Sequence, residues 1–506
     1  MPDTGSQAAA SPDQITPGEA MPDTRGLFFR VFPSICLPMF LAAVDATIVA
    51  TALPAIAGTL GDVERIGWVV VAYLMATTIA APVYGRLGDA LGRKRLMLMA
   101  LVVFIVASVL CAVAPTMLAL IAARVLQGAG GGGLMTLSQA LVGETVPPRE
   151  RGRYQGYLAS IFMVSSTFGP VMGGWLTQGV GWQAVFLINV PLGGLALVLA
   201  WRLPDRRPVP AAVRFDWLGL VLFAGFVVPL LLALERAQQI SMAVAPVIVA
   251  LLATAAGSVW LLLRQERRAR QPLIPVNVLR APAIWRSDAM AACVGAVIVS
   301  SITFMPIYLQ VVRGVTAGQT GLLLLPLTAG IAVGSLFTGR RIAKTGRTAV
   351  FPSYGLVVVV LALLTLAATA VVIPIGGLVV VFLLLSLTLG TAMPVVQVTV
   401  QSVAGAANLG AASASVQFSR SIGAALGTAG VGAVLFGVLS LNDRAVAEVF
   451  ADIVQRGPAI LYTLEPARRA LVSFEIAGAF RAAFCTIAGF AAIAMVLAWT
   501  LPVRKI

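Results

Sequence analysis

Long apolar runs separated by short polar segments dominate this chain. Each run of about 20 residues is long enough to cross a hydrocarbon layer of roughly 30 Å as a helix. The runs lie at approximately 31–54, 66–85, 96–114, 117–143, 154–177, 184–203, 215–235, 243–263, 287–309, 318–338, 350–371, 377–400, 411–437 and 478–502. The pattern therefore predicts an all-α integral membrane protein with fourteen transmembrane helices.

Composition supports a membrane location and narrows the chemistry. Of the 506 residues, 59% are hydrophobic and 11% are charged, with a mean hydropathy of +0.96, which is outside the range of soluble domains. The sequence contains no histidine, and its four cysteines form no CxxC pair, so we expect no metal and no cofactor. It also lacks a phosphate-binding GxxxxGK[ST] loop, which argues against ATP as an energy source.

The net charge of +15 indicates topology rather than nucleic-acid binding, because the basic residues form short clusters between apolar runs. With a cytoplasmic amino terminus, nearly all loop arginines and lysines fall on one side, and the opposite short loops carry only Arg65, Arg236 and Arg313. This asymmetry fits the positive-inside rule with an even number of helices. We therefore expect a multi-pass protein of a bacterial inner or plasma membrane, with both termini in the cytoplasm.

Two segments depart from the pattern of helices and short loops. Residues 1–28 are polar and rich in Pro, Asp and Gly, which predicts a disordered cytoplasmic tail, and the repeated string MPDT makes Met21 a possible alternative start. Residues 438–477 form a long outside loop in which Val446, Phe450 and Ile453 recur at helical spacing. This segment predicts an interfacial helix that either lies on lipid headgroups or covers the outer mouth of a pathway.

Three ionisable residues lie deep inside apolar runs, where a charge is costly and marks a functional hypothesis. Asp45 would load and release a proton or hold a cationic substrate, because burial favours the neutral form of a carboxylate. The alternative is an ion pair with Arg124 that only fixes the helix bundle. Arg420 would either snorkel to the cytoplasmic face or line a cavity towards anionic or polar substrate groups. The residues themselves do not decide between these readings.

The segment GRLGDALGRKR at residues 85–95 lies between the second and third predicted helices and resembles the most diagnostic motif of the major facilitator superfamily of transporters. The resemblance implies a gating motif that consists of Gly85, Asp89, Gly92 and Arg93. In such a motif the carboxylate faces a helix N-terminus or an arginine across the interface between two halves, and this latch stabilises one access state.

Three further segments resemble motifs of the fourteen-helix drug:proton antiporter branch: DATIVATALP at 45–54, LIAARVLQGAG at 120–130 and SSTFGPVMGG at 165–174. The resemblance implies proton coupling through Asp45 and Arg124, with Gln127 as a possible cavity residue. An antiporter motif follows in the fifth helix, where glycine spacing and proline imply a bent, tightly packed gating helix. Its residues are Gly169, Pro170, Gly173 and Gly174.

A weak second copy of the loop motif at 339–347 indicates two related six-helix halves. The predicted segments are the tail, an N-terminal six-helix bundle at 29–204, an inserted two-helix segment at 205–272 and a C-terminal six-helix bundle at 273–506. The resemblance implies a monomeric exporter of lipophilic or cationic drugs that works by alternating access and is driven by the proton gradient. Its expected partners are a small-molecule substrate, protons and membrane lipids.

Rival interpretations stay open at this point. A transporter of the same fold would carry another cargo, such as a lipid, a peptide, a siderophore or an amino acid. A membrane enzyme is disfavoured because the sequence offers no histidine and a single deep acid, Asp45. A sensor or receptor is disfavoured because we find no soluble signalling domain.

Overall fold

The computed structural model describes residues 24–204, 215–237, 244–269, 272–273, 276–456, 460–461 and 464–505. Within these ranges the chain is helical and has no strand apart from an isolated bridge between Arg347 and Lys505. Residues 1–23 of the predicted tail, with the alternative start at Met21, lie outside the described residues, as do parts of the predicted inserted segment.

The first part of the chain forms seven helices, which match the first six predicted runs. Their bounds are α1 Thr24–Leu60, α2 Trp68–Leu91, α3 Arg93–Ala112, α4 Met117–Thr145, α5 Arg151–Gly179, α6 Gln183–Leu187 and α7 Asn189–Trp201. The run 184–203 is divided between α6 and α7. The division follows from Pro191, which has no N–H to donate to the carbonyl of Leu187 at the end of α6.

The remaining helices match the other eight predicted runs and add two short helices. Their bounds are α8 Trp217–Arg236, α9 Ala245–Glu266, α10 Val276–Leu279, α11 Pro282–Ile307, α12 Ala317–Thr345, α13 Val350–Thr369, α14 Ile375–Leu389, α15 Ala392–Ala404, α16 Leu409–Asn442, α17 Arg444–Arg456 and α18 Pro466–Trp499. The run 377–400 is divided between α14 and α15 because Pro394 cannot donate to the carbonyl of Gly390. That carbonyl accepts the Ser335 hydroxyl at 2.8 Å instead.

Thirteen segments of the described chain are long and apolar enough to cross a membrane. Helix α5 is not among them, although its 29 residues give it sufficient length, because its serines, threonines and glycines lower its mean hydropathy. The all-α membrane fold is therefore confirmed, and the count of fourteen spans stays a prediction.

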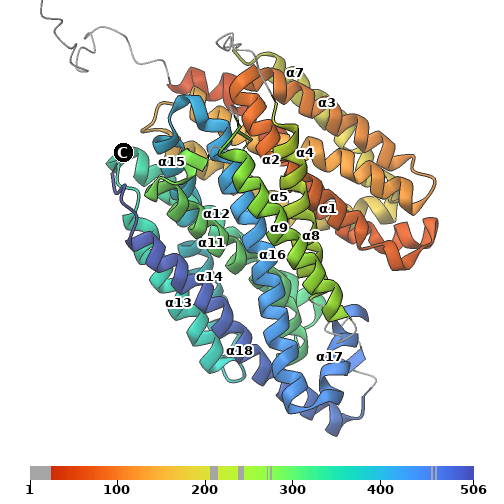
Figure 1. Ribbon diagram of the computed structural model, residues 1–506. Coiled ribbons are helices and arrows are strands. Elements are labelled where there is room, and N and C mark those ends of the chain that lie inside the picture. The colour runs from red at the N-terminus through yellow and green to blue at the C-terminus, as the bar shows by residue number, and fades with distance from the viewer. Residues whose placement is uncertain are drawn as a thin grey trace, which may run out of the picture.

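The helices form two groups that pack against each other. Helices α1 to α7 make up the first group, and α11 to α16 and α18 make up the second group (Figure 1). The main contacts between the groups run from α5 to α12 and from α2 to α16. Helices α8 and α9 pack on each other, and α8 also touches both α2 and α16. The segment boundaries predicted from the sequence stay a prediction.

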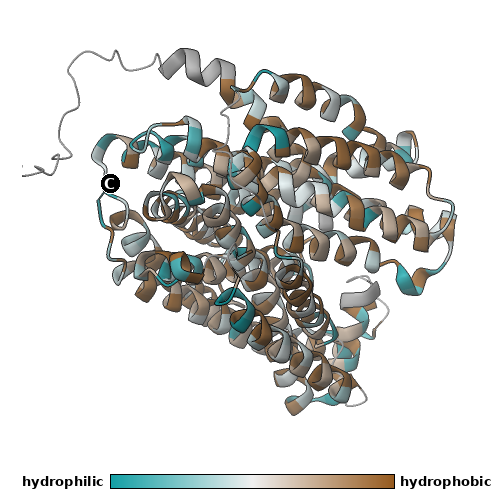
Figure 2. Cartoon of the chain, turned by 45° about the horizontal axis from the view of Figure 1, so that its top comes forward, coloured by the Kyte–Doolittle hydropathy of each residue, from teal (hydrophilic) through white to brown (hydrophobic). Residues whose placement is uncertain are grey.

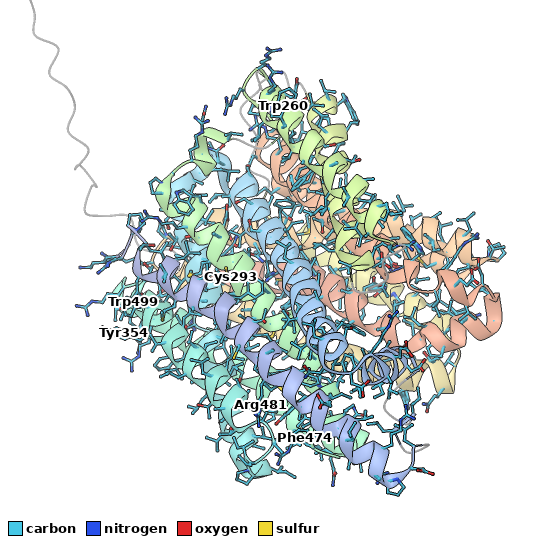
Figure 3. All side chains as sticks on the ribbon, turned by 60° about the horizontal axis from the view of Figure 1, so that its bottom comes forward. Trp260, Cys293, Tyr354, Phe474, Arg481 and Trp499 are labelled. Carbon is cyan, nitrogen blue, oxygen red and sulfur yellow. The ribbon has the colours of Figure 1, made fainter. Side chains whose placement is uncertain are left out.

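The outer surface of the bundle is suited to a lipid environment. Hydrophobic residues lie along the helices, and hydrophilic residues are concentrated towards loops and helix ends (Figure 2). Trp499 and Tyr354 are exposed near one end of the bundle (Figure 3), and the Trp499 indole donates a hydrogen bond to the carbonyl of Ser353 at 2.7 Å. Amphipathic aromatic residues at this level are typical of a membrane interface.

Helix α17 corrects one expectation about segment 438–477. The predicted helix is present, but its apolar face is buried against the protein and is not free to lie on lipid headgroups. Phe450 is fully buried, with its ring 5.3 Å from that of Phe436 in α16 and 6.5 Å from that of Phe480 in α18. Because α16 extends to Asn442 and α18 begins at Pro466, the helices themselves occupy most of the predicted loop.

Candidate functional site

An ion pair between Asp45 and Arg124 lies in the core of the first group. Asp45 comes from α1 and Arg124 from α4, and Arg124 Nη1 lies 2.6 Å from Asp45 Oδ2. Both side chains are 0% exposed. The structure thus brings together the two residues predicted to act in proton coupling. They form the ion pair that the sequence left as the alternative to a proton-loading role for Asp45.

Uncharged polar side chains complete the network around this ion pair. Gln127 Nε2 and Asn189 Nδ2 each donate to Asp45 Oδ1 at 2.8 Å. Gln127 also accepts from Arg124 Nη1 at 2.7 Å and donates to the Ser108 hydroxyl at 2.8 Å. Both carboxylate oxygens of Asp45 therefore accept hydrogen bonds from buried donors.

Aromatic rings enclose the guanidinium of Arg124. Its central carbon lies 4.1 Å from the centre of the Tyr73 ring and 5.9 Å from that of Phe186, and Nε donates to the carbonyl of Val69 at 3.0 Å. The Nη2 atom is buried and has no hydrogen-bond partner among the described residues. The site thus holds the charge of Arg124 by the ion pair and by cation–π contact, and it leaves the N–H groups of Nη2 without a partner among the described residues.

Asp89 joins the two groups of helices at the side that carries the α2–α3 and α4–α5 loops, which we call the arginine-rich side. Its carboxylate accepts hydrogen bonds from the backbone N–H groups of Gly410 at 2.8 Å and Ala411 at 3.0 Å. These residues begin α16, so the carboxylate lies at the positive end of a helix dipole in the opposite group.

Arg93 extends this junction. Its guanidinium contacts Asp89 Oδ1 at 2.5 Å and Glu144 Oε2 at 2.6 Å, and it reaches the carbonyl of Ala406 at 3.3 Å. Gly92 separates α2 from α3 with a φ of 97°, a conformation that favours glycine. Asp89, Gly92 and Arg93 of the predicted gating motif therefore lie together at this junction. The fourth residue of the motif, Gly85, lies one turn before Asp89 on α2.

Gly85 permits the close crossing of α2 and α16. A Cβ atom at Gly85 would lie 2.6 Å from the carbonyl oxygen of Gly410, which no side chain tolerates without movement. A second close crossing joins α5 and α12 on the same side, where a Cβ at Gly152 would meet Ile342 and a Cβ at Gly156 would meet the carbonyl of Ser335 at 2.7 Å. The two groups are thus held tightly at the arginine-rich side.

A small cavity lies between the two groups, with a volume of about 30 Å³, which is room for a few water molecules at most. Its walls come from α1, α4, α5, α11, α15 and α16. Its polar lining consists of Gln139, Gln155, Gln397 and Arg420. Arg420 therefore faces the cavity, as one of its two predicted roles required. Gln127 does not line this cavity, because it is fully buried in the network of Asp45, and its predicted cavity role stays a prediction.

The sequence model of the Major Facilitator Superfamily matches residues 35–428. The chain belongs to the major facilitator superfamily. A curated relative, an uncharacterized MFS-type transporter of Mycobacterium tuberculosis, is 34% identical over 430 residues, which cover 85% of this chain and 62% of the relative. The chain thus spans less than two thirds of the length of this relative.

Two proteins of Bacillus subtilis are also similar to the chain. One is a multidrug transporter protein, 30% identical, with 79% of this chain and 74% of the relative covered. The other is Multidrug resistance protein 3, 32% identical, with 60% of each covered. The superfamily is one of transporters and not of enzymes, so the alternative of a membrane enzyme is set aside.

Solved structures share the fold. The human organic anion transporter MFSD10 matches with a TM-score of 0.63 at 16% identity, covering 93% of this chain and 99% of the other. A proton:xylose symporter matches with a TM-score of 0.61 at 13% identity, covering 95% and 97%. These likenesses support the multi-pass superfamily fold alone.

Sequence reasoning did not identify Ser108, Asn189 and Tyr73 as partners of the buried ion pair. The available signal was weak, since each is an uncharged polar residue inside an apolar run. Because such residues cost little in a membrane helix, their position alone does not single them out.

The antiporter motif of this superfamily member packs against α1. A Cβ at Gly169 would lie 2.0 Å from Thr47 Oγ1, and a Cβ at Gly173 would lie 2.4 Å from the carbonyl of Ile48. A Cβ at Gly174 would meet nothing within 4 Å. The α5 helix continues through Pro170. The tight packing is thus present, and the gating role stays a prediction.

We expect Gly173→Ala to destabilise the protein by about 1–3 kcal/mol, because the added methyl group must displace α5 from the backbone of α1. Gly174→Ala is the matched control and should be neutral or slightly stabilising, since alanine is the better helix former. Thermal unfolding of both variants in detergent, followed by tryptophan fluorescence, checks this. Equal melting temperatures for the two variants would contradict the packing argument.

Proposed function

We propose that this chain is a secondary active transporter that exports lipophilic small molecules of the multidrug type in exchange for protons, by alternating access of the two helix groups. The observation that carries the proposal is the fully buried ion pair of Asp45 and Arg124. Protonation of Asp45 would leave the buried charge of Arg124 without a counter-ion. Because an unpaired buried charge is costly, protonation would destabilise the present packing of α1 against α4.

A chain of contacts connects Asp45 to the interface between the groups. Thr47 lies two residues after Asp45 on α1 and contacts α5 at Gly169. Towards its N-terminus, α5 packs on α12 of the second group, where the Ser160 hydroxyl donates to the carbonyl of Ala332 at 3.1 Å. A rearrangement of α1 that follows protonation therefore acts directly on a helix that forms the interface.

The proposed orientation places the arginine-rich side in the cytoplasm, so that the junction of Asp89 with α16 closes the cytoplasmic end. Cargo would then leave on the opposite side. A membrane potential of 100 mV supplies about 2.3 kcal/mol per charge moved, so one coupled proton can maintain more than a tenfold gradient of a neutral cargo.

Dye accumulation in inverted membrane vesicles energised by respiration tests the proposal. The panel contains a cationic dye (ethidium), a neutral dye (Nile red) and an anionic one (a dansylated fatty acid). We expect at least one dye to accumulate, to be released by a protonophore, and to alkalinise the vesicle lumen as it enters. Accumulation that survives the protonophore, or the absence of transport for the whole panel, would contradict the proposal.

A further inference from the structure

Arg420 occupies a distinctive place in the central cavity. It lies on α16 in the second group, and its guanidinium stacks over the ring of Phe162 on α5 in the first group, 4.9 Å from the ring centre. Its other contacts are with Gln417 Oε1 and with Met393 Sδ at 3.7 Å. The guanidinium therefore lies at the seam between the two groups, where any separation of α5 from α16 would uncover it.

No carboxylate neutralises this guanidinium within the described residues. The ion pairs there join other arginines to Asp45, Asp62, Asp89, Glu144 and Glu150. Asp288, on the adjacent helix α11, accepts from the Ser415 hydroxyl at 3.3 Å and lies beyond ion-pair distance of Arg420. A cation in a membrane interior that lacks a counter-ion is costly, so the cavity is electrostatically incomplete without an anion.

The neighbouring amides add hydrogen-bonding capacity to this charge. Gln155 Nε2 is buried and has no partner among the described residues, and neither does Gln397 Oε1. A glutamine side chain can rotate its terminal amide to present N–H groups to an oxyanion. An arginine fork together with amide donors is the set of groups that binds carboxylates in proteins.

Apart from Gln139, the rest of the cavity lining is apolar, and it contains no acid. It includes Met39, Leu158, Val294 and Val416. The resemblance implied lipophilic or cationic cargo, and the residue-level support for a cation was Asp45 as an acid able to hold it. Asp45 is sealed inside the first group with Arg124 and does not line the cavity, so that reason for a cation preference no longer applies.

We infer that the cargo is an amphiphile whose apolar body carries a carboxylate or similar oxyanion, and that Arg420 binds this oxyanion. The inference rests on the proposed export function and specifies its substrate class. The cavity as it stands is too small for such a molecule, so binding requires the two groups to separate near Phe162, which exposes the guanidinium to the cargo.

Binding measurements on the full chain in lipid nanodiscs test this inference without a proton gradient. Three dansyl probes share a fluorophore and an alkyl chain and differ in the end group: 11-(dansylamino)undecanoic acid, its methyl ester and the corresponding amine. We expect wild type to bind the acid at least about tenfold more tightly than the ester, which corresponds to about 1.4 kcal/mol and to a modest charge-assisted hydrogen bond. Empty nanodiscs correct for partition into lipid.

Arg420→Gln should weaken binding of the acid by about tenfold and leave ester binding within twofold, and Arg420→Lys should retain part of the preference. Arg481→Gln is the charge-matched control, because Arg481 is exposed on α18 (Figure 3) and should leave the preference unchanged. If Arg420→Gln does not fold, displacement of the ester probe from wild type by decanoate but not by decanol would support the inference.

Four results would overturn the inference: equal affinity of wild type for the acid and the ester, tighter binding of the amine, equal losses of acid and ester binding in Arg420→Gln, or a failure of wild type to bind the acid. In that case, proton-driven transport of a cationic or neutral dye would leave the proposed function intact, so the two failures are distinguishable.

Discussion

Replacing Asp45 by asparagine is expected to lower the rate of proton-driven efflux by about a hundredfold, equivalent to about 2.7 kcal/mol in the coupled step, while exchange of cargo down its own gradient continues. The amide occupies the same volume and can still accept from Gln127 and Asn189, but it cannot carry a proton. The substitution also leaves Arg124 as an uncompensated buried charge, so we expect a lower melting temperature.

Proteoliposomes with an imposed pH gradient separate these two effects, since uphill uptake and counterflow are measured in one preparation. The control is Asn189→Ala, which removes one hydrogen bond to the carboxylate and keeps the titratable group. It should lose about 1 kcal/mol of stability and remain coupled. If Asp45→Asn accumulates cargo uphill like wild type, the proton site lies elsewhere in the protein.

Replacing Asp89 by asparagine is expected to shift the protein by about a hundredfold towards the state that is open at the arginine-rich side. The carboxylate bridges two backbone N–H groups of α16 and the guanidinium of Arg93, and an amide loses both the ion pair and the favourable dipole interaction. Hydrogen bonds to charged groups contribute about 1.5–3 kcal/mol each, so a net loss near 2.7 kcal/mol is reasonable.

Labelling of a cysteine at Ser413 measures this shift. Ser413 is 1% exposed behind the junction on α16, so in a background without the four native cysteines a membrane-impermeant thiol reagent should reach it only in the open state. Asp62→Asn is the control, because that carboxylate pairs with Arg65 far from the junction. Identical labelling rates in Asp89→Asn and Asp62→Asn would show that Asp89 does not hold the two groups together.

The sequence predicted the helices and the charged members of the site, but not their partners. A helix of 20 apolar residues is visible in any window, and a charge such as Asp45 or Arg124 within it stands out because of its cost. Asn189 lies 144 residues from Asp45, and no local pattern connects the two. Serine is common at packed interfaces of membrane helices, so the sequence does not show that Ser108 bonds to the network around Asp45.

Other parts of the site depend on tertiary structure in the same way. The resemblance implied a helix N-terminus as a possible partner of Asp89, but the sequence could not say that it is the start of α16, because backbone N–H groups have no residue-specific signature. The resemblance gave Gln127 as a possible cavity residue, whereas in the structure its amide is bound within the network of the ion pair. The apolar face of α17 was recognised, and the surface that it covers was not.

Helix α8 touches both groups, with the Phe223 ring 5.1 Å from that of Phe418 on α16 and with Ile79 and Val83 of α2 packed into the same cluster. These contacts are apolar side chains without directional bonds, in contrast to the hydrogen-bonded junction at Asp89. Surfaces of this kind can slide with little loss of free energy, because dispersion contacts are exchanged and no hydrogen bond is broken. If the two groups move as proposed, the contacts of α8 with α2 and α16 would therefore shift without the loss of a hydrogen bond, whereas the junction at Asp89 would have to break.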